Sequence, residues 1–295
     1  MTSPTDIPSP DRLSGLLRHF HASAEMFHSG PLCGTTSFYD GPEYGHLHVL
    51  RAGTVQVLHY GDSSPLGTAQ LDQPAVLFYP CAAPHRFVTP LDGSTHMVCA
   101  TVRFEAGPAH PVTAALPPLC LVPLADMPGL AHTVEALFAE AMPATPGPAC
   151  GRQLVCDRLF EALLVQLLRW LIDHAPADGP TEGLLAGLAH PQLARALNAI
   201  HQQPGALWDL PRLAATAGMS RSAFAASFRR TVGLAPGDYL TRWRMVLAGQ
   251  RLARGEPLKQ VALALGYSSA TALSRVFAAH HGVAPRAWRQ NAGGF

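Results

Sequence analysis

Two contrasting patterns of apolar residues divide this chain. From about residue 33 to residue 104, short apolar runs alternate with Gly, Pro and Asp, as in His46–Leu50, Thr54–Tyr60, Ala75–Tyr79 and Met97–Phe104. Runs of this length separated by turn residues predict the strands of a small β-barrel or jelly roll. From residue 127 onward, apolar residues recur three or four positions apart, which predicts helices.

The helical part begins with two predicted helices, about Met127–Met142 and Gly151–His174. The second carries an apolar stripe that fits either a core against the barrel or a dimer interface: Leu154, Leu159, Leu163, Leu167 and Leu171. Pro176–Gly183 is rich in Pro and Gly and predicts a linker. A short amphipathic helix is also expected at Asp11–Phe20, ahead of the barrel.

The C-terminal part of the chain contains an internal duplication. Its matched landmarks are offset by 48 positions up to a glycine and by 49 positions after it: Leu210/Leu258, Gly218/Gly266, Phe224/Leu273, Phe228/Phe277, Gly233/Gly282 and Pro236/Pro285. In each copy a short apolar helix ends at a glycine, and a serine follows that can cap the next helix. The pattern predicts two helix-turn-helix units, at about 209–232 and 257–281, joined by a long helix over Pro236–Arg254.

The charge is divided unevenly along the chain, although the whole chain carries only +1. Residues 190–295 hold 13 Lys and Arg against 3 Asp and Glu, a formal +10, whereas residues 1–189 hold 8 against 17, a formal −9. A basic half that coincides with the repeated motif points to a polyanion, with Arg-rich helices that are merely soluble as the alternative. The helix-turn-helix shape makes double-stranded DNA the expected partner. The chain shows no signal peptide, no apolar run long enough for a membrane helix and no CxxC motif, so we expect a cytoplasmic protein with reduced thiols that does not bind a membrane.

Residues 192–289 resemble the AraC/XylS-type transcription regulators. The resemblance rests on the Leu-x-x-Leu-Ala-x-x-Ala-Gly-Met-Ser opening, Val232-Gly-Leu-x-Pro236, Tyr239-Leu-x-x-Trp-Arg-Met245, Ala262-x-x-Leu-Gly-Tyr267 and Gly282-Val-x-Pro285. The N-terminal part resembles the cupin-type sensor domain of such regulators through His46-Leu-His48-Val-Leu, Pro80 and His85. These resemblances imply an α+β protein. Residues 1–179 would form a cupin-like β-barrel at about 33–104 with helices at about 127–174, and residues 190–295 an all-α DNA-binding domain.

The resemblance also implies which residues contact DNA. The first reading face would comprise Arg221, Ser222, Ala225 and Ala226, and the second Ala270, Thr271, Ala272, Ser274 and Arg275. Alanine cannot hydrogen-bond a base edge, although it can touch a thymine methyl group, so we expect Arg221 and Arg275 to carry most direct readout. The expected phosphate contacts are Arg229, Arg230, Arg242 and Arg244, with a solvated helix end as the alternative for Arg229 and Arg230.

The histidines of the barrel region suggest an effector site. His46 and His48 are two residues apart on one strand and therefore share a face, and the resemblance to cupins implies that His85 joins them. Neutral imidazoles inside a barrel can bind a transition metal. Ala52 stands where cupins have a glutamate, so a fourth ligand would come from His96 or Cys99. Alternatively these histidines are polar groups that bond backbone or a small organic effector, and the sequence establishes no cofactor.

Several interpretations of function remain open at this point. The preferred one is a homodimeric DNA-binding transcription regulator, not an enzyme, whose barrel senses an organic ligand, a metal or an oxidant. An oxidant would act on Cys33, Cys81 or Cys99, provided that one of these thiols is exposed and acidic. The alternatives are a metal-dependent cupin enzyme fused to a DNA-binding domain, and a DNA-binding protein that responds to no effector.

Overall fold

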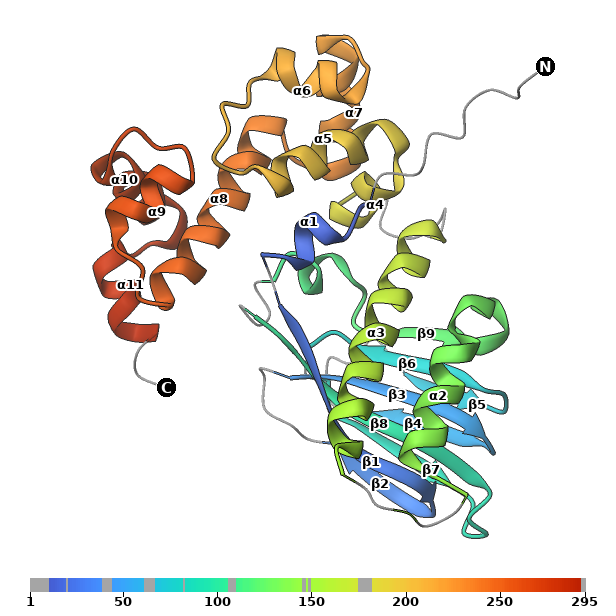
Figure 1. Ribbon diagram of the computed structural model, residues 1–295. Helices are drawn as coiled ribbons and strands as arrows, with labels where there is room; N and C mark the ends of the chain where they lie inside the picture. The colour runs from blue at the N-terminus through green and yellow to red at the C-terminus, as the bar shows by residue number, and fades with distance from the viewer. Residues whose placement is uncertain are drawn as a thin grey trace, which may run out of the picture. The chain divides into compact units, whose positions relative to one another are not determined.

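The computed structural model describes residues 11–292 except 20, 39–43, 61–66, 82, 106–109, 145–146, 148–149 and 175–181 (Figure 1). These residues fall into an N-terminal unit, residues 21–174, and a C-terminal unit that combines residues 11–19 with residues 182–292. Most of the linker predicted at Pro176–Gly183 lies outside the described residues, and so does Phe20 of the first predicted helix.

The N-terminal unit contains two antiparallel sheets, with strand orders β1-β8-β3-β6-β9 and β2-β7-β4-β5. Its strands are β1 (Ala22–Leu32), β2 (Gly34–Phe38), β3 (Gly45–Ala52), β4 (Val55–His59), β5 (Thr68–Leu71), β6 (Ala75–Tyr79), β7 (His85–Thr89), β8 (Thr95–Phe104) and β9 (Cys120–Pro123). This is the predicted sheet-rich arrangement, except that hydrogen bonds between the described strands do not close the two sheets into one barrel.

The main core of the N-terminal unit draws side chains from both sheets. Leu50, Leu77 and Met97 come from the first sheet, and Val57 and Phe87 from the second. Strands β3 and β6 lie inside the first sheet and are buried on both faces from His46 to Leu50 and along all of β6, which explains their continuous apolar character. For that reason the apolar runs predicted from the sequence, His46–Leu50 and Ala75–Tyr79, agree closely with β3 and β6.

Strand β1 was missed by the sequence analysis. Its residues do not alternate regularly between apolar and polar, and they include Gly30 and Pro31, so they do not predict a strand. Among the described strands β1 lies at the edge of its sheet and pairs with β8 alone, and an edge tolerates proline because one side of the strand needs no hydrogen-bond partner. The short strands β2, β5, β7 and β9 were missed as well.

Two helices follow the sheets, α2 (Ala131–Ala141) and α3 (Arg152–Asp173), and α3 packs against both α2 and β1 (Figure 1). Of the predicted leucine stripe, Leu163 and Leu167 are fully buried, whereas Leu154 is 57% exposed, so the middle of the stripe is core. Single 3-10 turns lie at Thr113–Ala115, Leu124–Asp126 and Pro128–Leu130. Among the described residues, every helix is too short or too polar to cross a bilayer.

The C-terminal unit is entirely helical, and α8 joins its two groups of helices (Figure 1). The helices are α1 (Ser14–Leu17), α4 (Leu184–Ala189), α5 (Pro191–Gln202), α6 (Leu210–Ala217), α7 (Arg221–Val232), α8 (Pro236–Ala253), α9 (Leu258–Ala264), α10 (Ala270–His281) and α11 (Pro285–Ala292). We call α6–α7 the first head and α9–α10 the second head. Both heads and the long connecting helix agree with the elements predicted from the repeat.

Helix α1 departs from the predicted domain boundary, which assigned residues 1–179 to one N-terminal domain. Its Leu16 is fully buried and Leu13 is 7% exposed, and α1 packs against α5 of the C-terminal unit. A Cβ atom on Gly15 would lie 3.2 Å from side-chain atoms of His201 and Gln202, so the contact is close. Residues 11–19 therefore pack with the C-terminal unit, because their apolar face is buried there.

Candidate nucleic-acid interface and buried histidine cluster

The turns of the two heads are built as the repeat predicted. Gly218 ends α6 in the left-handed conformation, with φ 67°, and the Ser220 hydroxyl accepts a hydrogen bond from the backbone N–H of Ala223 at the start of α7. In the second head Gly266 has φ 75°, and Ser269 caps α10 through the N–H of Ala272 at 3.1 Å. Both serine caps fix where the second helix of each head begins.

Aromatic and aliphatic side chains anchor the second helix of each head. Phe224 and Phe228 of α7 are fully buried, and so are their counterparts Leu273 and Phe277 of α10. Phe228 packs edge-on against Tyr239 of α8, and Phe277 packs edge-on against Trp288 of α11. The buried face directs the opposite face of each helix outward, which a DNA-reading helix requires.

Most of the predicted DNA contacts lie on that outward side. The exposed ones are Arg221, Ser222, Ala226, Arg229, Arg230, Arg242, Thr271 and Arg275. Ala225, Ala270, Ala272 and Ser274 are partly exposed. Within the described chain, no hydrogen bond or ion pair engages the guanidinium groups of Arg221, Arg229, Arg230 or Arg275, which keeps them available for a polyanion.

Arg244 differs from the other predicted phosphate contacts. It is partly buried and donates from Nε to the carbonyl oxygen of Pro204 at 2.7 Å and from Nη2 to that of Ala206 at 2.9 Å. Its guanidinium also lies over the Tyr267 ring, 5.6 Å from the centroid. These contacts link the loop before the first head to the second head, and the phosphate contact of Arg244 stays a prediction.

Three histidines of the N-terminal unit form a buried group that we call the histidine cluster: His46, His48 and His85. His46 and His48 project from β3 of the first sheet, and His85 begins β7 of the second. All three are at most 1% exposed, and one ring nitrogen of each lies within 4.8 Å of the others. The two sheets therefore bring together residues that are far apart in sequence, as the cupin resemblance implied.

Aromatic rings enclose the histidine cluster. The His85 ring is stacked between Phe38 at 4.9 Å and Tyr79 at 4.1 Å, and the His48 ring meets Phe87 edge-on at 4.8 Å. Phe27 lies 6.0 Å from the His46 ring and is 45% exposed, so it separates the cluster from solvent. Rings packed at these distances hold the imidazoles in fixed orientations.

A hydrogen bond orients the His85 ring, and burial lowers the pKa of His48. His85 Nδ1 lies 2.7 Å from the Ala83 carbonyl oxygen and donates to it, which leaves His85 Nε2 as an acceptor. That Nε2 lies 3.0 Å from His48 Nε2. Burial, followed by the nearby His85, His46 and His28, holds the pKa of His48 well below its usual range. His48 is therefore neutral, the form in which an imidazole binds a metal ion.

His28 is a further histidine of this region that the sequence analysis missed. It pairs with Cys99 across β1 and β8, and Cys99 pairs with His48 across β8 and β3, so the three residues form a row on one sheet face. A register shift between Met26 and His28 accompanies this placement. A ring N–H of His28 donates to the backbone of Gly30, and its Nε2 is buried with no partner among the described residues. No sequence signal marked His28, because β1 itself was not predicted.

The two residues considered as a possible fourth ligand lie outside the histidine cluster. Cys99 is fully buried and belongs to the apolar core, on the same face as His48, but outside the group of close ligand atoms. His96 is three residues away on β8, pairs with Pro31 and Ala52, and is also outside that group. The structure thus joins His46, His48 and His85 and leaves His96 and Cys99 apart from them.

The thiols proposed as oxidant sensors are mostly protected. Burial raises the pKa of the Cys99 thiol and also that of the Cys81 thiol, which disfavours the reactive thiolate at both positions. Cys33 is exposed. Of the three thiols, Cys33 therefore stays as the candidate oxidant sensor.

Comparison with known proteins gives two matches to domain families. The family described as Cupin matches residues 11–173, and the family described as Helix-turn-helix domain matches residues 213–291. An AraC-like transcription regulator of Streptomyces lividans is 33% identical over 96% of this chain and 98% of its own length. The RCS-specific HTH-type transcriptional activator RclR of Escherichia coli is 27% identical over 81% of this chain and 86% of its own.

Solved structures give weaker similarities. The DNA-binding domain of AdpA in complex with a target DNA is 30% identical, with a TM-score of 0.32 over 33% of this chain and 89% of that one. ToxT from Vibrio cholerae is 11% identical, with a TM-score of 0.38 over 94% of this chain and 100% of that one.

Proposed function

Because this chain belongs to the AraC-like transcription regulators, we propose that it is a cytoplasmic one-component regulator whose histidine cluster receives the signal. The two heads bind DNA, and the N-terminal unit acts as a sensor, since the relatives named above are transcriptional regulators. The observation that supports the sensing role is the enclosed group of three imidazoles, whose ring nitrogens lie within 4.8 Å of one another.

A transition metal is the effector that fits these residues best. The His85 arrangement, with Nδ1–H bonded to a backbone carbonyl and Nε2 directed at the cluster, is the one that metal-ligating histidines use to fix their tautomer. His48 Nδ1 has no hydrogen-bond partner in the described part of the chain, so a neutral organic effector could also bond there. Imidazole ligands favour zinc, copper, iron or nickel over calcium or magnesium.

Elemental analysis of the purified, tag-free protein tests this proposal. We expect about one transition metal ion per chain, lost in a His48→Ala/His85→Ala variant. A His96→Ala variant is the matched control, because it removes a histidine of β8 that lies outside the cluster. If the wild type holds no metal after dialysis against zinc, copper and nickel, the result contradicts a metal effector and favours an organic one. Equal metal in all variants would also contradict the proposal.

We assign the arginines of the C-terminal unit to two kinds of DNA contact, base edges and phosphates. Arg221 and Arg275 stand on α7 and α10, the helices that would enter successive major grooves, and we assign them to base edges. Arg229 and Arg230 at the end of α7, together with Arg242 on α8, contact phosphates. A binding-site selection with the full chain would identify the bases that each head reads.

A further inference from the structure

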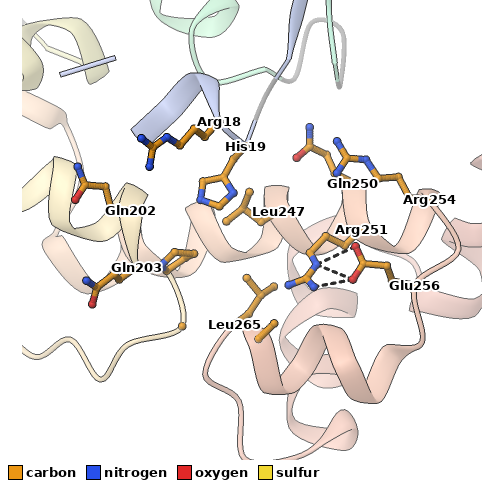
Figure 2. A pocket seen from close by; sticks show the side chains of 13 residues that line it. Arg18, His19, Gln202, Gln203, Leu247, Gln250, Arg251, Arg254, Glu256 and Leu265 are labelled. Carbon is orange, nitrogen blue, oxygen red and sulfur yellow. Dashed lines mark hydrogen bonds and ion pairs between the residues drawn. The ribbon is translucent and has the colours of Figure 1, made fainter. Parts of the chain in front are cut away.

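The loop that leads into the first head packs against the turn of the second head. Gly205 of this loop lies so close to the end of α9 that a Cβ atom on it would overlap the Ala264 carbonyl oxygen. The contact is mutual, since a Cβ atom on Gly266 would overlap the Gly205 carbonyl oxygen. Residues 203–205 and 264–265 also line one pocket, where Figure 2 labels Gln203 and Leu265. Glycine permits backbone segments to approach this closely, so the heads meet at a defined point besides their connection through α8.

Arg244 of α8 stabilises this contact. Its Nε donates to the Pro204 carbonyl oxygen at 2.7 Å and its Nη2 to the Ala206 carbonyl oxygen at 2.9 Å, so its donors hold both neighbours of Gly205. On the other side its guanidinium lies over the Tyr267 ring of the second head, 5.6 Å from the centroid. A charged donor makes strong hydrogen bonds, and a planar guanidinium fixes the direction of both. We call the residues of this contact the head joint: Gly205, Arg244, Ala264, Gly266 and Tyr267.

The loop is also held from the side of the first head. Arg212 of α6 donates to the Leu207 carbonyl oxygen at 2.8 Å, and its guanidinium lies over the Trp208 ring, 4.2 Å from the centroid. The Trp208 Nε1–H donates to the Gln203 carbonyl oxygen at 2.8 Å. Side chains therefore bond the carbonyl groups of residues 203, 204, 206 and 207, and the loop cannot change its backbone without breaking these bonds. The position of α6 is thereby tied to the head joint.

Two separate connections relate the heads, the helix α8 and the head joint. A connecting helix alone leaves its two ends as hinges about which each head can turn, because hinge motions concentrate at the ends of elements. A second contact away from the helix closes a ring of elements and removes that freedom. The structure therefore favours heads that keep one separation and one orientation.

We propose that the head joint makes the two heads one rigid body, and that Arg244 thereby sets which spacing between half-sites the protein accepts. The inference rests on the proposed binding of both heads to DNA. Successive major grooves are about 34 Å and about 10.5 base pairs apart. One extra base pair moves a half-site by about 3.4 Å and turns it by about 34°. Rigid heads cannot follow this change, so the DNA must deform at a cost in affinity. Arg244 is then a positioning residue that acts without touching DNA.

Binding of the full-length protein to duplexes of altered spacing tests the proposal. The probes are the two-part site that binding-site selection yields and the same duplex with one base pair inserted or deleted between its half-sites. We expect either change to weaken wild-type binding about tenfold or more, measured by fluorescence anisotropy. A wild type that binds all three duplexes within about twofold would overturn the inference, because its heads would then adjust to the DNA.

The same selection separates this inference from the proposed function. If selection with the wild type yields no two-part site, DNA binding by both heads is wrong and the inference falls with it. A two-part site whose spacing the variants below do not affect would overturn the inference alone.

Arg244→Met removes both donors and keeps an unbranched side chain. We expect it to bind the best duplex about three- to tenfold more weakly, because binding must then order the heads. We also expect less than about threefold difference among the three duplexes. Arg242→Met is the matched control, since Arg242 is exposed on the same helix. It should weaken all three duplexes alike and keep the spacing preference. An unchanged preference in Arg244→Met would overturn the inference.

Arg244→Lys distinguishes the head joint from a phosphate contact. Lysine keeps the positive charge but lacks the planar pair of donors. We therefore expect Arg244→Lys to lose the spacing preference as Arg244→Met does. If Arg244 acts through phosphate instead, lysine should restore affinity and leave the spacing preference as in the wild type, which would overturn the inference.

Gly205→Ala changes the head joint without removing a charge. The added methyl group would overlap the Ala264 carbonyl oxygen and separate the loop from α9, so we expect a weaker spacing preference. Gly237→Ala is the matched control, because a Cβ atom there meets no described atom within 4 Å. Urea denaturation verifies that each variant is folded before its duplexes are compared. An unchanged preference in folded Gly205→Ala, or a weakened one in Gly237→Ala, would contradict the role of the joint.

Discussion

The candidate binding residues of the N-terminal unit are buried, whereas those of the C-terminal unit are exposed. In the N-terminal unit His46, His48 and His85 are enclosed by rings between two sheets. In the C-terminal unit the candidate DNA contacts Arg221 and Arg275 are exposed, and the helices that carry them are anchored by buried aromatic residues. The difference teaches what each unit can bind. An enclosed group recognises something small and desolvated, whereas an exposed cationic surface recognises a polyanion.

The largest expected difference is in how salt affects binding: DNA binding by the C-terminal unit should depend on salt far more than metal binding by the N-terminal unit. Raising monovalent salt from about 50 to about 200 mM is expected to weaken DNA binding by about 10³-fold or more, because each phosphate contact releases counterions. Metal binding to the histidine cluster should change by less than about tenfold, because buried groups are screened little. Fluorescence anisotropy with a selected duplex and metal titration measure the two effects. Similar salt slopes for both ligands would contradict the comparison.

Substitutions on the buried face and on the exposed face of the second helix of a head should separate stability from binding. Phe277→Ala removes a fully buried ring and is expected to lower the free energy of unfolding by about 3–5 kcal/mol. Arg230→Ala removes an exposed charge and should change it by less than about 0.5 kcal/mol while weakening DNA binding for all sequences alike. Urea denaturation and anisotropy give both quantities. A stable Phe277→Ala protein would mean that α10 is not anchored as described.

The two heads can then be compared with each other. Arg275→Ala should cost about 1–3 kcal/mol at the preferred base and relax the preference at that position in the second half-site. Arg221→Ala should do the same in the first half-site and leave the second unchanged. Binding-site selection with each variant measures this, with Arg195→Ala as a control outside the reading helices. A uniform loss of affinity with unchanged base preference would reassign the arginine to phosphate.

A further expected effect concerns a buried histidine of the C-terminal unit. Burial, with a smaller effect of His19, lowers the pKa of His201 from 6.5 to about 3. The folded chain therefore keeps this imidazole neutral while the unfolded chain protonates it. Its contribution to stability is complete above about pH 6.5 and is lost as the pH falls towards 3.

The slope of unfolding free energy against pH in that range should therefore fall by up to about 1.4 kcal/mol per pH unit in a His201→Gln variant. Urea denaturation at several pH values measures the slope. His21→Gln, which changes an exposed histidine, is the control. Identical slopes for wild type and His201→Gln would show that His201 is protonated in the folded state or solvated.

Local patterns in the sequence predicted the parts of the fold that depend on local interactions. The repeat located both heads, since the glycines at 218 and 266 and the capping Ser220 and Ser269 act on their own neighbours. The histidine pair on β3 could be placed on one face from its spacing alone. Edge strand β1 could not be predicted, because its pairing with β8 stabilises a segment whose composition does not favour a strand.

The sequence by itself determined the two kinds of unit, the duplicated heads, the basic character of residues 190–295 and the family resemblance. Only the tertiary structure decided that α1 joins the C-terminal unit, that His28 lies in the row of His48 and that Arg244 bonds backbone carbonyls of the loop before the first head. The physical reason is that each of these outcomes depends on which distant surface covers a residue. Periodicity shows that a face is apolar, but only packing shows what covers it and which polar groups are left without a partner.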